Sequence, residues 1–317
     1  MRKIIISIIA VSLLIIGCKK SNNYNYVFAT GGTSGTYYSF GGSIASIWNA
    51  NIEGMNVTAQ STGASSENLR LLNRHEADLA FVQNDVMDYA YNGTDIFANE
   101  VLTNFSAMLT LYPEIVQIAA SKESGIKSIA DMKGKRVSVG DAGSGVEFNA
   151  KQILETYGLS FNDINKANLS FKESSDGLQN GTLDACFIVA GIPNAALQEL
   201  SLSKDIVLIS LDKVQVDELL NKYKYYTEIT IPANTYNGVT TDTAAIAVKA
   251  SIAVNNNIPE DVVYNLMKTL FDKKADLSIA HSKGEELDID SAPKGISIPF
   301  HPGAIKYYQE LGYSIGQ

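Results

Sequence analysis

Two glycine-rich stretches decide the fold of this chain, Gly31-Gly32-Thr33-Ser34-Gly35 and Gly140-Asp141-Ala142-Gly143-Ser144-Gly145. Each follows a short apolar run typical of a β-strand and precedes a segment with helical spacing of apolar residues. A strand–loop–helix turn places free backbone N–H groups and the positive end of a helix at one point, which favours an anion. Two such turns predict two lobes that hold one small anionic ligand between them. The alternative is that both are ordinary tight turns, because neither stretch completes a nucleotide-binding fingerprint.

Strands and helices are predicted to alternate along the whole chain, as in doubly wound α/β lobes. We expect helices near residues 37–48, 67–75, 146–157 and 259–273, the last opened by Pro259 and two acidic residues. The expected strands cover residues 27–30, 56–60, 77–82, 136–139, 168–172 and 185–190.

Two long extended segments divide the chain, residues 105–120 and 243–254, and the first is expected to break at Tyr112-Pro113-Glu114. Such a pair suggests that the chain crosses into a second lobe and returns. The predicted division is lobe I from residues 27–113 plus 250–317, and lobe II from residues 114–249.

The first residues read as a targeting segment. Arg2 and Lys3 precede an apolar stretch over residues 4–16 that is short for a membrane span, and Gly17-Cys18 follows, as in a bacterial lipobox. We therefore expect residues 1–17 to be a lipoprotein signal peptide, Cys18 to be lipidated, and residues 18–26 to form a tether. An uncleaved anchor helix and a soluble signal peptide are the alternatives. The expected location is extracytoplasmic, in the periplasm or on the cell surface, anchored to a membrane through Cys18.

The composition excludes some partners. The chain carries 34 acidic and 25 basic residues, a net charge of −9, which argues against nucleic acid. Cys186 is the only cysteine besides Cys18, and it lies in an apolar run, so we expect a buried thiol. We expect a monomer.

The sequence contains few catalytic or metal-binding motifs, which favours a binding protein over an enzyme. The three histidines are far apart in sequence, and none has a second His or Cys at metal-ligand spacing. No nucleophile elbow, zinc-protease motif or complete phosphate loop is present. We expect no metal, no cofactor and no turnover; an enzyme on the same scaffold is the rival class.

The candidate ligand-binding residues are those that can present hydroxyl, amide or backbone N–H groups at strand ends. Gln83 and Asn84 suit an amino or amide group, and Ser144 with the backbone around Gly145 suits a carboxylate. The predicted set is Gly32, Thr33, Ser34, Tyr37, Thr62, Gln83, Asn84, Ser144, Gly145, Val146 and Gly191.

Seven stretches, in order, resemble the TAXI family (TRAP-associated extracytoplasmic immunogenic proteins). They cover residues 29–38, 67–72, 77–85, 139–145, 231–236, 257–264 and 298–308. The resemblance implies a two-lobed, type II periplasmic-binding-protein-like fold and delivery of a small amino acid or dicarboxylate, glutamate or glutamine first, to a TRAP-type membrane permease. The second loop departs from the family's usual pattern at Asp141, Ala142 and Val146, which leaves room for a neutral amino acid. A surface-exposed immunogenic or sensory lipoprotein without transport is the alternative.

Overall fold

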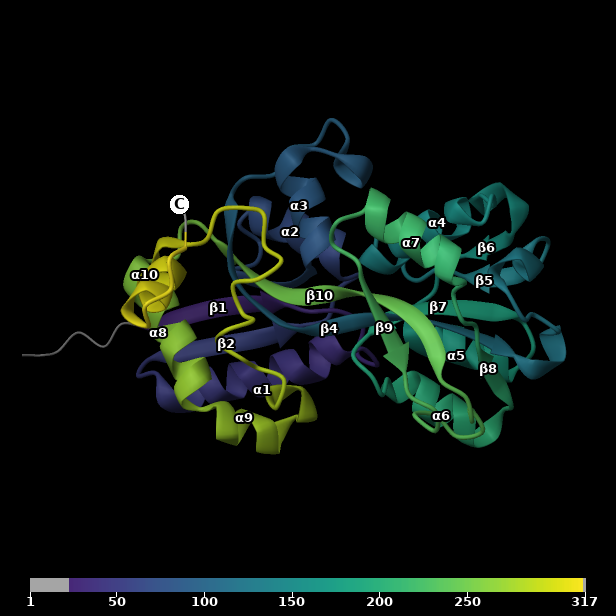
Figure 1. Ribbon diagram of the computed structural model, residues 1–317. Helices are drawn as coiled ribbons and strands as arrows, with labels where there is room; N and C mark the ends of the chain where they lie inside the picture. The colour runs from purple at the N-terminus through teal and green to yellow at the C-terminus, as the bar shows by residue number, and fades with distance from the viewer. Residues whose placement is uncertain (1–22, 316–317) are drawn as a thin grey trace, which may run out of the picture.

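The computed structural model describes residues 23–315 as one ten-stranded mixed sheet with helices on both of its faces (Figure 1). The order along the sheet is β2-β1-β3-β10-β4-β7-β5-β6, while β8 pairs with β4 and β9 with β10. The strands are β1 (Tyr24–Ala29), β2 (Met55–Gln60), β3 (Leu79–Gln83), β4 (Phe105–Ser121), β5 (Arg136–Ser138), β6 (Asn165–Ala167), β7 (Ala185–Ala190), β8 (Ile206–Leu208), β9 (Thr227–Ile231) and β10 (Thr243–Asn255).

The helices gather around the two ends of the sheet, with α1–α3 and α8–α10 at one end and α4–α7 at the other (Figure 1). Among the described residues, no helix combines the length and the apolar character that crossing a membrane requires. The α-helices are α1 (Thr36–Asn51), α2 (Ser65–Asn73), α3 (Asn84–Asn92), α4 (Gly145–Thr156), α5 (Phe171–Gln179), α6 (Ala195–Ser203), α7 (Lys213–Lys222), α8 (Glu260–Asp272), α9 (Lys274–Ala280) and α10 (Pro302–Glu310).

The long strands β4 and β10 run antiparallel through the middle of the sheet and join its two ends. Near one end β10 pairs with β3, and near the other it pairs with β9, while β4 goes on to pair with β7 and β8. The change of partner falls where Lys249 lies opposite Pro113 and Val248 opposite Glu114.

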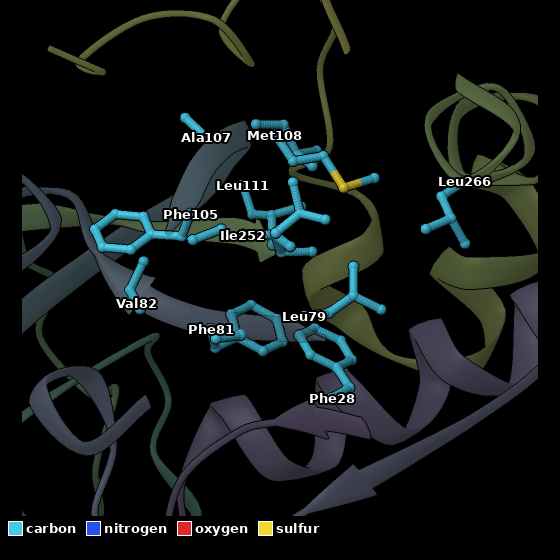
Figure 2. Packing of buried hydrophobic residues seen from close by; sticks show 14 of the residues in the cluster. Phe28, Leu79, Phe81, Val82, Phe105, Ala107, Met108, Leu111, Ile252 and Leu266 are labelled. Atoms are coloured by element: carbon cyan, nitrogen blue, oxygen red, sulfur yellow. The ribbon is translucent and has the colours of Figure 1, made fainter. Parts of the chain in front are cut away.

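The apolar core is divided at the same place. One buried cluster takes its residues from the chain up to Tyr112 and from Ala250 onward. The other clusters take theirs from Ile115 through Val248. Figure 2 shows the first cluster, in which Phe28, Leu79 and Phe81 pack near Ile252 and side chains of β4. The rings of Phe28 and Phe81 stack with centroids 5.1 Å apart, a separation favourable for aromatic pairs.

Three sequence predictions about the elements are wrong. The strand β4 continues through Pro113, because a shift in register between Lys249 and Ser251 accommodates the residue that lacks an N–H. The strand expected at residues 168–172 lies earlier, as β6, and Phe171 begins α5 behind a capping box made by Ser170 and Glu173. Residues 24–26, predicted as part of a tether, belong to β1, since Tyr24 already pairs with Met55 of β2. Cys18 and the signal segment lie outside the described residues.

Candidate functional site

The two glycine loops face each other across a small cavity between the ends of the sheet. The first loop joins β1 to α1, and the second joins β5 to α4, as the sequence predicts. The cavity between them measures about 40 Å³. Its walls are formed by Gly31, Gly32, Gly35, Thr36, Tyr37, Ala64, Ser65, Gln83, Glu114, Gly145, Val146, Phe171, Val189 and Ala190.

A buried carboxyl group forms part of the cavity wall. Glu114 is only 3% exposed, and its Oε2 accepts a hydrogen bond of 2.5 Å from the Tyr37 hydroxyl. Burial raises the pKa of Glu114 from the ordinary 4.5 to about 8, although the Tyr37 hydrogen bond opposes the rise. Burial, followed by the nearby Glu114 charge, also holds the pKa of Tyr37 well above its usual value. The pair thus offers a carboxyl group that lacks a cationic partner among the described residues.

Gln83 and Gly145 bring the two sides of the cavity into contact. The Gln83 side chain lies so close to Gly145 that a Cβ placed on this glycine would be 1.8 Å from Gln83 Oε1. That oxygen is buried and accepts no hydrogen bond from the described residues. Only glycine therefore allows this approach, and the amide oxygen remains available to a donor.

The first loop leaves its helix uncapped. Gly35 is the N-cap of α1 and has no side chain to accept from the first backbone N–H groups. The positive end of a sixteen-residue helix is therefore open at the cavity.

The second loop and the helix that follows it satisfy some of their own donors. Ser144 Oγ caps α4 by accepting from the Glu147 N–H at 3.3 Å, and the Glu147 carboxylate accepts from the Gly143 N–H at 2.7 Å. Lys166 neutralises Glu147 at 2.7 Å. The Ser144 hydroxyl is thus occupied at the helix start.

A polar network connects α3 and α4 beside the cavity. The Asn149 amide donates to Asp85 at 3.2 Å and to the Tyr226 hydroxyl at 2.7 Å, and Tyr226 donates to Gln152 at 2.6 Å. Asp85 is 1% exposed, and burial raises its pKa from 3.8 to about 6 despite hydrogen bonds that lower it. The network thus adds a second buried carboxyl group between the two ends of the sheet.

The structure brings together part of the predicted residue set. Gly32, Tyr37, Gln83, Gly145 and Val146 line the small cavity. Thr33 and Ser34 line a neighbouring cavity, and Gly191 lies against the side chain of Lys283, which borders that same cavity.

Three other predicted residues line neither of these two cavities. Thr62 donates to Asn68 Oδ1 at 2.6 Å, and Asn84 joins Gly295 to Lys249 through hydrogen bonds of 2.9 Å. Ser144 is the helix cap described above.

Sequence reasoning missed Glu114 as a site residue and took its segment only as a break in the strand. A signal was available, because a lone acidic residue inside a long apolar strand is seldom buried without a function. The described arginines give no alternative charge at the cavity, since Arg70, Arg74 and Arg136 are each paired with a surface carboxylate.

Solved structures share this fold. The periplasmic aliphatic sulphonate binding protein SsuA from Escherichia coli has a TM-score of 0.52 at 16% identity, with 91% of this chain and 84% of that chain covered. A binding protein component of an ABC phosphonate transporter from Pseudomonas aeruginosa has a TM-score of 0.52 at 11% identity, with 84% of this chain and 80% of that chain covered. A structure described as a periplasmic transporter has a TM-score of 0.56 at 13% identity, with 91% of this chain and 92% of that chain covered. The predicted α/β periplasmic-binding-protein-like fold is thereby confirmed.

The family prediction is corrected. Membership of the TAXI family is wrong, because the family model that matches this chain is a different one and the structural relatives include ABC-type binding proteins. The match extends over residues 28–312, nearly all that the structure describes. The chain therefore belongs to the NMT1-like family.

Proposed function

We propose that this protein is an extracytoplasmic solute-binding protein that encloses one small molecule between two lobes without turnover. The family and the fold support this role. Lobe I would comprise residues 27–113 plus 250–317 and lobe II residues 114–249, in line with the divided core. The cavity lined by both glycine loops would hold the solute. Its 40 Å³ is less than an amino acid needs, so the Gln83 side chain would have to move when the solute enters.

The observation that carries the proposal is the buried Glu114–Tyr37 pair. A carboxylate removed from water is stabilised best by an opposite charge, and no described cation pairs with this one. A protonated amino group on the solute would supply that charge and lower the pKa of Glu114. We therefore infer that the solute is an amine-bearing molecule, an amino acid with glutamate or glutamine first.

The alternative hypothesis, that the protein is an enzyme, has little support in the chemistry of the described residues. Burial raises the pKa of the Cys186 thiol to about 12, so this group stays protonated and unreactive at neutral pH. Cys186 also lies within β7 rather than at the cavity.

The partner would be an integral membrane permease. The phosphonate-transporter relative makes an ABC-type permease the first candidate, and a TRAP-type permease is the alternative. Lipid anchoring through Cys18 stays a prediction, as does the alternative of a surface lipoprotein without transport.

Thermal-shift measurements with matched ligand pairs would test the proposal. We expect glutamate or glutamine at ~100 times its dissociation constant to stabilise the protein by roughly 2.7 kcal/mol. Glutarate, which lacks the amine, should give little shift. Glu114→Gln should weaken amino-acid binding about 10–100-fold, because a buried charge-assisted hydrogen bond is lost. Glu53→Gln, at an exposed turn, is the matched control. The proposal fails if no amine-bearing solute shifts the wild type, or if Glu114→Gln binds it as tightly.

A further inference from the structure

A second cavity adjoins the small one at the end of the first glycine loop. It measures about 240 Å³ and shares Gly35 and Thr36 with the small cavity. Three separate segments enclose it: the loop with the start of α1, the start of α6, and the turn η5 (Ser282–Gly284) after α9. Figure 1 shows α1 and α9 at one end of the sheet and α6 at the other, so this cavity also lies between the two ends.

The lining of this cavity is rich in hydrogen-bond donors. Thr33, Ser34 and Ser282 contribute hydroxyl groups, and none of the eleven described residues that line it is acidic. This is unexpected for a chain of net charge −9. A donor-rich enclosure without carboxylates suits an oxyanion.

Lys283 supplies a buried positive charge. Its side chain is only 9% exposed, its Nζ lies 5.5 Å from the centre of the Tyr112 ring, and its stem packs against Gly191. His281 accepts from the Lys283 N–H through Nδ1 at 3.1 Å, which leaves Nε2 to donate to Ser39 Oγ at 3.1 Å. Burial, and then the Lys283 charge, lower the pKa of His281 below 6.5, so this imidazole is mostly uncharged at neutral pH.

The partner of Lys283 is replaceable. Its ammonium pairs with Glu286, whose side chain is 36% exposed and also borders a neighbouring cavity that contains Lys249. Glu286 does not line the donor-rich cavity. A ligand oxyanion would therefore replace the Glu286 carboxylate, which is exposed enough to be solvated when it leaves Lys283.

We propose that the cavity bordered by Lys283 binds the anionic group of the solute, a carboxylate or another small oxyanion. The assignment of the group to the solute rests on the proposed function, and anion binding by the cavity does not. The solute would then extend past Gly35 and Thr36, which line both cavities, with its amine at Glu114 and its anionic group at Lys283.

Inorganic sulfate is the probe for the cavity by itself. Calorimetric titration at constant ionic strength should give saturable binding to the full-length protein. Lys283→Met should weaken it by about tenfold or more, because a charge-assisted contact is lost. Glu286→Gln should tighten it several-fold, because the competing carboxylate is gone. Lys268→Met is the matched control, since Lys268 is also ion-paired on a helix but lines neither cavity.

The two variants are expected to change sulfate affinity in opposite directions, so Glu286→Gln still tests the proposal if Lys283→Met fails to fold. Equal sulfate affinity in wild type and Glu286→Gln, or no saturable sulfate binding to either, would overturn the anion site. If sulfate behaves as expected but the affinity for the amine-bearing solute is the same in Lys283→Met as in the wild type, the cavity binds anions and the link to the solute is wrong. Failure of the proposed function would appear separately, as the absence of binding by any amine-bearing solute.

Discussion

The two glycine loops are close equivalents in sequence and differ in what their donors do. The first ends at Gly35, which cannot cap α1, and the loop residues face two cavities. The second ends at Ser144, which caps α4, and Glu147 accepts from the Gly143 N–H. One loop thus has free donors for a ligand, whereas the other has its own acceptors and contributes mainly the small size of Gly145. A glycine-rich turn identifies a ligand loop only when its helix start lacks a side-chain cap.

The largest expected effect comes from filling the space at Gly145. In Gly145→Val the new side chain would occupy the position of the Gln83 amide, and Gln83 lines the cavity proposed for the solute. We expect solute binding to weaken on the order of 100-fold or more, since overpacking costs a few kcal/mol at a tight contact. Calorimetric titration measures this.

Gly42→Val is the control for that variant, because Gly42 lies within α1 with open space around it. Far-ultraviolet circular dichroism should show both variants folded. Normal binding by Gly145→Val would show that the second loop does not restrict the site at all.

An intermediate effect is expected from pH, through the carboxyl group that faces the first loop. The pKa of Glu114 is about 8 in the folded protein against 4.5 ordinarily, so the unliganded fold binds this proton more tightly than the unfolded chain does. The stabilisation is complete below pH 4.5 and is lost as pH rises towards 8. Asp85 stabilises the fold in the same way, and its contribution is lost as the pH rises from 3.8 to about 6.

Melting temperatures of the unliganded protein should therefore fall from pH 5 to pH 8. Glu114→Gln should remove the fall above pH 6 and lessen the fall below it, whereas Asp85→Asn should affect only the part below pH 6. The same slope in wild type and Glu114→Gln would contradict a raised pKa for Glu114.

The smallest effect separates the two loop serines. Ser144→Ala should cost about 1 kcal/mol of folding stability through the lost cap and leave solute affinity nearly unchanged. Ser34→Ala lies in the loop whose helix start is uncapped, and it should keep the free energy of unfolding within about 0.5 kcal/mol of the wild type. Urea unfolding of the two variants measures the difference, and equal losses would remove the distinction between the loops.

The sequence predicts regular elements well where apolar spacing and end signals agree. The spacing from Tyr37 to Trp48 predicts α1, and the apolar run over residues 243–254 predicts β10. Prediction fails at Pro113 and at Phe171, where a register shift and a capping box override the local signals.

The site is less predictable than the fold, because hydroxyl and amide groups look alike in sequence whether they meet a ligand or the backbone. Asn84 and Thr62 are equally polar candidates, yet both are used to hold chain segments together. The sequence does not reveal Glu114 as a candidate site residue, because its burial depends on residues far away in the chain, such as Tyr37.

Because Glu114 lies on β4 directly opposite Val248 of β10, its position is fixed by the strands that join the two ends of the sheet. If the proposed lobes moved about these strands, a carboxyl group here would keep nearly the same place in the open and closed forms. The amine would therefore meet Glu114 in the first encounter, and the contacts at Gly145 would form in a later step. Binding would then have two kinetic phases, with a concentration-dependent capture followed by a concentration-independent closure that sets the residence time.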